Sequence, residues 1–263
     1  SNKDGENTMN LLQTIEITLT IPTKLQLTAS MGSVMQGILM ENIDTQYAAY
    51  LHHQSMQPYS QYCLFDKKSH LLKWRISVLK TEASKESLLP LMNLSGPRHV
   101  RNKHTYFSIK GKKLLRDTTY EKLALQYLTD NQPCIDKTLT YTFLTPTAFK
   151  RNNQYVVYPE MPLIIASLLH RWNAFADITS LNHDDILPLL LKYPLWTRNY
   201  ELFMQPFSLE RTKIPAFQGS LSFSSGKHEM AGKILCLLSN FAAYSGIGIK
   251  TAIGMGAVET RID

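Results

Sequence analysis

Near its end the chain reads Phe241-Ala-Ala-Tyr-Ser-Gly-Ile-Gly-Ile-Lys-Thr-Ala-Ile-Gly-Met-Gly-Ala-Val-Glu259, with glycines at 246, 248, 254 and 256. Glycine tolerates positive φ and lets a backbone N–H approach a phosphate with no Cβ in the way. A dinucleotide-binding loop is excluded, because a helix is expected before this run and only seven residues follow Gly256. A Walker A loop is excluded because Ile249 replaces the glycine before the lysine. Two interpretations remain: a loop that follows a nucleic-acid backbone, or a tight turn before the last strand.

The second half of the chain, upstream of this run, has the periodicities of strands and helices. Leu139, Tyr141 and Phe143 alternate with other residues over 137–145, as in a strand. Pro162 stands at the first turn of an expected helix that ends at Phe175, a position that favours proline. The other expected elements are helices over Asp184–Leu191 and His228–Ala243 and strands over Asn199–Leu209, Gln218–Phe223 and Ala257–Thr260.

The first half repeats this order of elements. Ile15, Ile17 and Leu19 alternate with polar residues and predict a strand over 13–21, and Asp44 is a candidate helix cap. The other expected elements are helices over 33–42, 45–53, 88–92 and 118–128, the last capped by Asp117, and strands over 59–65 and 70–80. Each half then reads roughly as strand, helix, two strands, helix, strand, which predicts an α+β chain of two tandem ferredoxin-like (RRM-like) domains. The expected boundaries are a disordered tail or cloning scar over 1–8, an N-terminal domain over 9–135 and a C-terminal domain over 136–263.

The composition indicates a folded protein with a polyanionic partner. Among 263 residues, 28 Lys and Arg face 21 Asp and Glu, a net charge of +7. The three cysteines form no C-x-x-C pair and the histidines show no H-x-x-x-H spacing, so no metal and no cofactor are expected. No apolar run is long enough to span a bilayer. We expect a soluble, cytoplasmic protein that does not associate with membranes.

A basic stretch over 98–116 holds seven cations and no acid, with aromatic residues interleaved. Cations hold phosphates and aromatic faces stack on unpaired bases, so Arg98, Arg101 and Lys103 are candidate RNA contacts. The other interpretation is a solvated hairpin without a ligand.

Taken together, these segments resemble a family. The glycine-rich run, L-T-P-T-A-F-K (144–150), the segment over 159–173 and I-P-A-F-Q-G-S-L-S-F (214–223) are similar to the second domain of CRISPR-RNA-processing endoribonucleases of the repeat-associated RAMP superfamily. Y-L-H-H-Q-S-M-Q-P-Y-S (50–60) resembles the segment in which many members place a catalytic histidine. The resemblance covers nearly the whole chain after the tail and is more specific in the second half.

The resemblance implies two ferredoxin-like domains that face each other across a basic cleft. It also implies metal-independent cleavage of precursor CRISPR RNA inside each repeat, by attack of the upstream 2′-hydroxyl on the phosphorus. The expected products carry a 2′,3′-cyclic phosphate (or 3′-phosphate) and a 5′-hydroxyl. The catalytic histidine falls on His52, with His53 as the second choice. The implied RNA-binding residues of the loop are Gly246, Gly248, Lys250, Gly254 and Gly256.

The sequence departs from the family around this histidine. Some members have a tyrosine upstream, where this chain has Met35-Gln36-Gly37, and the helper lysine that soon follows the histidine is missing. Tyr47, Tyr59 or a lysine of the basic stretch could act as the helper. The alternative function is a non-catalytic, RNA-binding subunit of a CRISPR interference complex, which the histidines of L-H-H disfavour. The expected partners are CRISPR repeat RNA and an interference complex, bound by a monomer or a homodimer.

Overall fold

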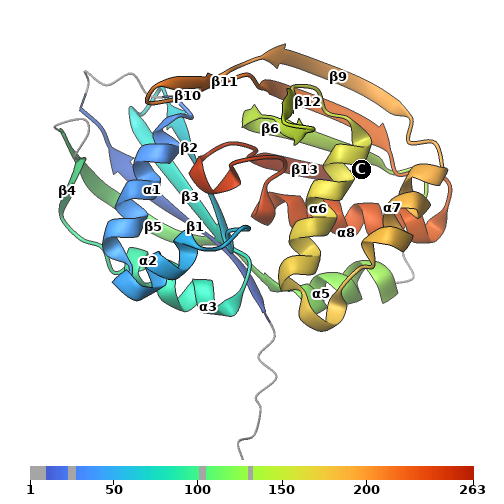
Figure 1. The fold of residues 1–263 in the computed structure, drawn as a ribbon, viewed down its shortest axis with the longest axis horizontal. Coiled ribbons are helices and arrows are strands. Elements are labelled where there is room, and N and C mark those ends of the chain that lie inside the picture. The colour runs from blue at the N-terminus through green and yellow to red at the C-terminus, as the bar shows by residue number, and fades with distance from the viewer. Residues whose placement is uncertain (1–9, 23–27, 101–104, 130–132) are drawn as a thin grey trace, which may run out of the picture.

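The computed structural model of the chain describes residues 10–22, 28–100, 105–129 and 133–263 and has two α+β halves side by side (Figure 1). Strand β1 (Leu11–Thr20) lies in the middle of the first sheet, whose order is β2-β3-β1-β5-β4 with antiparallel neighbours. The other elements of this half are α1 (Met31–Asn42), α2 (Thr45–His52), β2 (Tyr59–Asp66), β3 (Leu71–Val78), α3 (Thr81–Ala83), the π-helical turn η1 (Ser84–Leu88), α4 (Leu89–Met92), β4 (Pro97–Val100), β5 (Thr105–Thr119), α5 (Tyr120–Ala124) and the π-helical turn η3 (Leu125–Thr129).

The second half has its own four-stranded sheet, of order β13-β6-β12-β9, again with antiparallel neighbours. Its elements are β6 (Thr138–Thr147), β7 (Phe149–Arg151), β8 (Gln154–Val156), α6 (Met161–Phe175), the 3-10 turn η4 (Asp177–Thr179), α7 (His183–Lys192), β9 (Thr197–Met204), β10 (Phe207–Leu209), β11 (Thr212–Ile214), β12 (Phe217–Ser224), α8 (Glu229–Ser245), the 3-10 turn η5 (Thr251–Ile253) and β13 (Val258–Ile262). The two sheets share one arrangement: β1 lies between β5 and β3 in the first sheet, as β6 lies between β13 and β12 in the second. Strand β4 is an addition at one edge of the first sheet.

Most expected elements are confirmed within one or two residues, two expectations are wrong in detail, and two short hairpins were not expected. Strand β5 continues to Thr119, whose hydroxyl accepts the Lys122 backbone N–H at 3.1 Å, so Thr119 and not Asp117 caps α5. The strand expected over 199–209 is two strands, interrupted at Pro206, which has no N–H for a ladder hydrogen bond. The hairpins β7–β8 and β10–β11 were not predicted, because three-residue strands are too short to show periodicity.

The two halves share a hydrophobic core. The cluster built by α6, α8 and the second sheet also takes in Leu12, Leu79 and Tyr120 of the first half. The Tyr120 ring packs edge-on against Trp172 at a centroid distance of 4.9 Å, and its hydroxyl donates to the Leu79 carbonyl at 2.8 Å. Because apolar packing crosses the junction, the relative placement of the two sheets is part of the fold.

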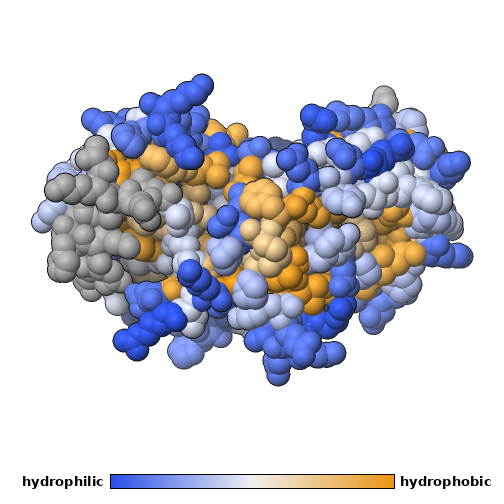
Figure 2. All heavy atoms as spheres, turned by 90° about the horizontal axis from the view of Figure 1, so that it is seen from above, coloured by the Kyte–Doolittle hydropathy of each residue, from blue (hydrophilic) through white to orange (hydrophobic). Residues whose placement is uncertain are grey.

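Strand β9 forms the outer edge of the second sheet, at the top of Figure 1. Figure 2 looks down on this side of the molecule and shows hydrophobic residues lying among hydrophilic ones. Four large side chains are exposed here, namely Trp196, Tyr200, Phe203 and Met204. Among the described residues, no helix is both long and apolar enough to cross a membrane.

Candidate functional site

The end of helix α2 presents His52 to solvent. The helix begins at the Asp44 carboxylate, which accepts the backbone N–H groups of Gln46 and Tyr47 at 2.9 and 3.0 Å. Tyr47 and Leu51 anchor one side of the helix in the core of the first half. His52 follows Leu51 directly and is therefore turned away from the core by about 100°, where its imidazole is exposed.

His52 and His53 differ from the other histidines whose side chains the structure describes. In that part of the chain, no hydrogen bond, ion pair or ring contact engages either imidazole, and both are exposed. The others have structural contacts: His70 lies against Phe65, His170 against His183, and His228 caps α8. A free, solvent-facing imidazole is able to transfer a proton to or from a bound ligand.

The glycine-rich loop between α8 and β13 is tightly packed. Gly248 has φ +85°, and a Cβ there would lie 2.3 Å from the Ala148 carbonyl oxygen. Gly256 has φ +70°, and its Cβ would lie 2.0 Å from the carbonyl oxygen of Ile247. Both positions therefore require glycine for packing, as the turn interpretation predicts. Lys250 has φ 55° and is exposed, so the loop does present one cation to solvent.

The loop also docks on the first half of the molecule. The Gln61 side-chain amide donates to the Gly32 carbonyl at 2.6 Å and to the Ala252 carbonyl, in the loop, at 2.9 Å. The Ser60 hydroxyl donates to the Tyr244 carbonyl, at the end of α8, at 2.5 Å. Ser60 and Gln61 are the second and third residues of strand β2, which follows α2 through residues 53–58. The segment that carries His52 thus leads directly into the strand that holds the loop.

The basic stretch forms the β4–β5 hairpin, and its side chains divide between the two faces of the first sheet. Arg98 pairs in register with the buried Phe107 and therefore lies on the helix-covered face. The Lys112 ammonium donates to the carbonyl oxygens of Met92, at 2.6 Å, and Leu94. Lys113 points to the opposite face. The described cations of the stretch therefore do not form one patch. Arg101 and Lys103 lie outside the described residues, and the RNA contacts of the stretch stay predictions.

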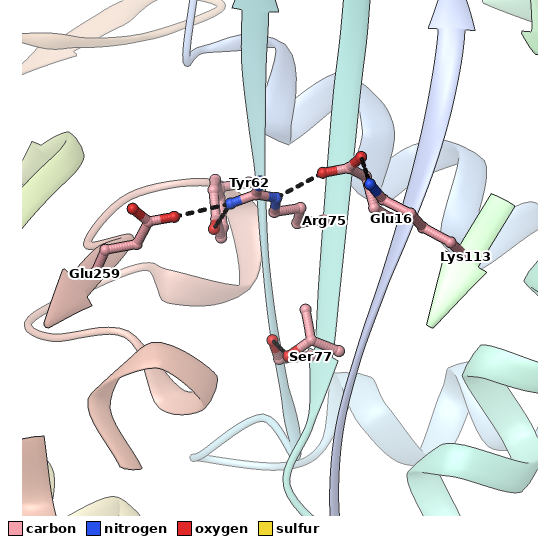
Figure 3. Close-up of polar contacts among 7 residues, drawn as sticks. Glu16, Tyr62, Arg75, Ser77, Lys113 and Glu259 are labelled. Carbon is pink, nitrogen blue, oxygen red and sulfur yellow. Dashed lines mark hydrogen bonds and ion pairs between the residues drawn. The ribbon is translucent and has the colours of Figure 1, made fainter. Parts of the chain in front are cut away.

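The face of the first sheet opposite the helix-covered one carries a charged network centred on Arg75 (Figure 3). Glu16 is only 2% exposed and accepts Arg75 Nε at 2.8 Å, while Lys113 Nζ lies 3.4 Å from its other oxygen. Burial alone would raise the pKa of Glu16, but the hydrogen bond and charge of Arg75, with help from Lys113, lower it overall. Arg75 also contacts Glu259 of the second sheet at 3.0 Å and the Tyr62 hydroxyl at 3.1 Å, so the network joins the two halves.

A groove of about 330 Å³ opens beside this network, at the junction of the two halves. The Arg116 guanidinium lies over the Tyr244 ring, 5.7 Å from its centroid. The groove is lined by Arg75, Leu115, Arg116, Ala243, Glu259 and Thr260. Arg75 is paired with both Glu16 and Glu259, whereas no ion pair of the described residues includes Arg116, so Arg116 is the cation here that favours an anionic ligand.

The helper tyrosines considered from the sequence are both core residues. Tyr47 is 6% exposed and Tyr59 is 1% exposed, and burial raises the pKa of both hydroxyls. The Tyr59 hydroxyl accepts the Gln36 side-chain amide at 3.0 Å. Neither hydroxyl reaches the surface where His52 lies, which disfavours both as helpers. In the described part of the chain, no three His, Cys, Asp or Glu side chains gather as a metal site would require.

Sequence reasoning missed three residues that build the site. Gln61 clamps the loop to β2, Arg75 joins the two sheets, and Arg171 of α6 donates to the Gly248 carbonyl at 2.5 Å. No local pattern marks any of them, because each contact joins residues from different halves or distant elements. Ser167 and Arg171 do lie in the segment over 159–173 that carried the family resemblance.

Comparisons with known proteins agree with this architecture. A family model described as CRISPR-associated endoribonuclease Cas6 matches residues 141–258. A Mycobacterium tuberculosis protein described as CRISPR-associated endoribonuclease Cas6 is 27% identical over 252 residues, covering 94% of this chain and 77% of the relative. A Streptococcus thermophilus protein with the same description is 28% identical over 229 residues, covering 85% of this chain and 88% of the relative.

Solved structures show the same fold. Thermus thermophilus Cas6 superimposes with a TM-score of 0.74 at 21% identity, over 97% of this chain and 100% of that one. A Cas6 product complex gives a TM-score of 0.77 at 20% identity, over 95% of this chain and 100% of that one. The fold, the family match in the second half and the two sequence relatives agree with the resemblance inferred from the motifs. Over nearly its whole length, the chain is therefore similar to proteins described as CRISPR-associated endoribonuclease Cas6.

Proposed function

We propose that this protein cuts precursor CRISPR RNA within each repeat, without a metal ion. The 2′-oxygen upstream of the cut attacks the phosphorus while the bond from phosphorus to the 5′-oxygen breaks. The products then carry a 2′,3′-cyclic phosphate (or, after its hydrolysis, a 3′-phosphate) and a 5′-hydroxyl. The observation that carries this proposal is the free, exposed His52. It lies on the segment that leads into β2, and β2 in turn bonds the glycine-rich loop through Gln61.

His52 is the proposed general acid or base. A neutral imidazole would take the proton of the attacking 2′-hydroxyl, or an imidazolium would give a proton to the leaving 5′-oxygen. Such a proton transfer contributes roughly 10²–10⁴ in rate. His53 shares the exposure of His52 and remains the second candidate. Alignment of the 2′-oxygen with the phosphorus supplies the rest, together with nearby cations or N–H groups that stabilise the added negative charge.

Two cationic surfaces are proposed to hold the RNA. The first is the glycine-rich loop, in which Lys250 faces solvent and the backbone is shaped by four glycines, Gly246, Gly248, Gly254 and Gly256. The second is the groove with Arg75 and Arg116, which corresponds to the basic cleft that the resemblance implies. Arg98, Arg101 and Lys103 of the hairpin are kept as further candidate contacts. Relatives with this fold have been solved as product and substrate-mimic complexes, which supports RNA as the ligand.

The two halves are proposed to be ferredoxin-like domains over 9–135 and 136–263. In each sheet four strands follow the order last, first, third, second, which is the order of that fold: β5-β1-β3-β2 in one and β13-β6-β12-β9 in the other. The helices that follow the first and third strands supply the β-α-β-β-α-β succession. Helix α5 belongs to the first range, but it packs with α6 and α8. The boundary near 136 therefore divides the chain into two ranges without dividing the hydrophobic core in the same way.

The decisive experiment uses repeat RNA from the genome that encodes the protein, with excess EDTA. We expect one cut per repeat and a 5′-hydroxyl on the downstream product, mapped by phosphatase and kinase treatment of the ends. An RNA with a single 2′-deoxy nucleotide upstream of the cut should bind but stay intact, because the nucleophile is missing. Cleavage of that RNA at the normal rate would contradict the mechanism. Binding of the normal RNA without any cleavage would instead indicate a non-catalytic subunit.

A further inference from the structure

Helix α6 holds the glycine-rich loop through two residues one turn apart, Ser167 and Arg171. The Gly248 backbone N–H donates to the Ser167 hydroxyl at 2.9 Å, and the Arg171 guanidinium donates to the Gly248 carbonyl at 2.5 Å. The guanidinium also donates to the Ser167 hydroxyl at 2.6 Å and to the Thr251 hydroxyl at 3.4 Å. Both polar groups of Gly248 are thereby fixed to one face of α6.

The charge on Arg171 lacks the compensation that other arginines of this protein have. Arg75 contacts two glutamates and Arg151 contacts Glu160 at 2.7 Å. No carboxylate in the described part of the chain forms an ion pair with Arg171, and its hydrogen-bond acceptors there are neutral oxygens. Burial lowers the pKa of Arg171 to about 10, so the group is still charged at neutral pH. A cation held among neutral groups is costly to the fold unless an anion is bound nearby.

The position of this cation points to the anion. Its contacts Gly248 and Thr251 flank Ile249 and Lys250, and Lys250 is exposed. Arg171 thus places a second positive charge on the α6 side of the loop, bonded to the residues on either side of the pair Ile249–Lys250. Charges act over longer distances through protein than through water, because the effective dielectric constant is lower.

We propose that Arg171 is a positioning residue for RNA binding, and that its guanidinium supplies the inner half of a two-charge phosphate site whose outer half is Lys250. This inference rests on the proposed function, in which the loop contacts RNA. A purely structural clamp needs only hydrogen-bond donors, whereas a phosphate site also needs the charge. Variants that separate charge from hydrogen bonding therefore test it.

The test compares Arg171→Gln and Arg171→Lys with the wild-type protein. The ligand is repeat RNA with one 2′-deoxy nucleotide upstream of the cut, so that binding is measured without cleavage. The binding constant is measured over a series of salt concentrations, and the unfolding of each free protein is followed in parallel. We expect Arg171→Gln to weaken binding. The fall of log K with log salt should become less steep by about one, the change expected when one phosphate is no longer neutralised. Arg171→Lys keeps the charge and should keep the slope.

A matched control removes an arginine elsewhere. Arg198 is exposed on the outer edge strand β9, so Arg198→Gln makes the same charge change away from the loop and should leave the slope as in the wild type. A folded Arg171→Gln protein with the wild-type slope would overturn the proposal and leave Arg171 as a structural clamp. A lowered slope in folded Arg171→Lys would overturn it as well, and that variant serves alone if the glutamine variant does not fold. If the wild-type protein binds no repeat RNA, the proposed function itself fails first.

Discussion

The end of α2 and the glycine-rich loop are two of the proposed contacts with RNA, and the fold holds them in very different ways. His52 stands at the exposed end of an eight-residue helix anchored by Tyr47 and Leu51. The loop is buried and bonded to α6, to β2 and to the chain before β7. A residue that performs chemistry from an exposed helix end can be replaced without structural cost. A residue that shapes a buried loop cannot, so mutations should separate the two roles.

The largest effect is expected for His52→Ala. Loss of the proton-transfer group should slow cleavage by roughly 10²–10⁴-fold, while RNA affinity and the unfolding temperature stay unchanged. Single-turnover cleavage at saturating RNA measures the rate. His53→Ala is the matched control, because His53 is the next residue and is equally exposed. Full activity in His52→Ala together with loss of activity in His53→Ala would transfer the role to His53.

Gly256→Ala should show the opposite behaviour, a loss of stability. Its Cβ would lie 2.0 Å from the Ile247 carbonyl oxygen at a φ of +70°, so the loop must move. We expect the free energy of unfolding to fall by about 2–4 kcal/mol, measured by urea denaturation. Gly37→Ala is the control, since a Cβ on this exposed residue of α1 meets nothing within 4 Å. That variant should be more stable by about 0.5–1 kcal/mol, and an equal loss in both would refute the comparison.

Glu16→Gln tests how much the buried carboxylate contributes to the stability of the first sheet. The variant leaves Arg75 and Lys113 without their buried carboxylate, and we expect a loss of about 1–3 kcal/mol of unfolding free energy at pH 7. The folded pKa of Glu16 is lowered, so its stabilisation is complete above the unfolded value of roughly 4.3 and is lost as pH falls through the folded value. The difference between wild type and variant should therefore shrink in acid. A difference that does not change between pH 7 and pH 3 would contradict this assignment.

The smallest effect is expected for Lys250→Ala, because this side chain is exposed and the loop backbone does not depend on it. Binding of repeat RNA should weaken by about 1 kcal/mol, and the salt slope should fall by about one. The unfolding temperature and the cleavage rate at saturating RNA should not change. An equally large decrease in thermal stability would show that Lys250 belongs to the structural part of the loop.

Local patterns predicted much of this molecule. The alternation of Ile15, Ile17 and Leu19 marked β1, and Pro162 marked the first turn of α6, because both signals depend only on neighbours in the sequence. The motif around His52 made it the candidate catalytic residue, and this role stays a prediction; the structure shows that His52 is exposed at the end of α2. The cap of α5 was misplaced by two residues, since Asp117 and Thr119 are equally good caps by composition and only the length of β5 chose between them.

The sequence by itself determined most of the strands outside the β4–β5, β7–β8 and β10–β11 hairpins, the main helices, the basic balance and the motifs that carry the family resemblance. Only the tertiary structure decided that Glu16 is buried beneath Arg75, that Lys112 and Lys113 serve opposite faces, and that the loop docks on β2. It also placed the Arg171 guanidinium behind a loop 77 positions away. The physical reason is range: periodicity and capping act within a few residues, whereas burial and charge compensation depend on partners that only folding brings together.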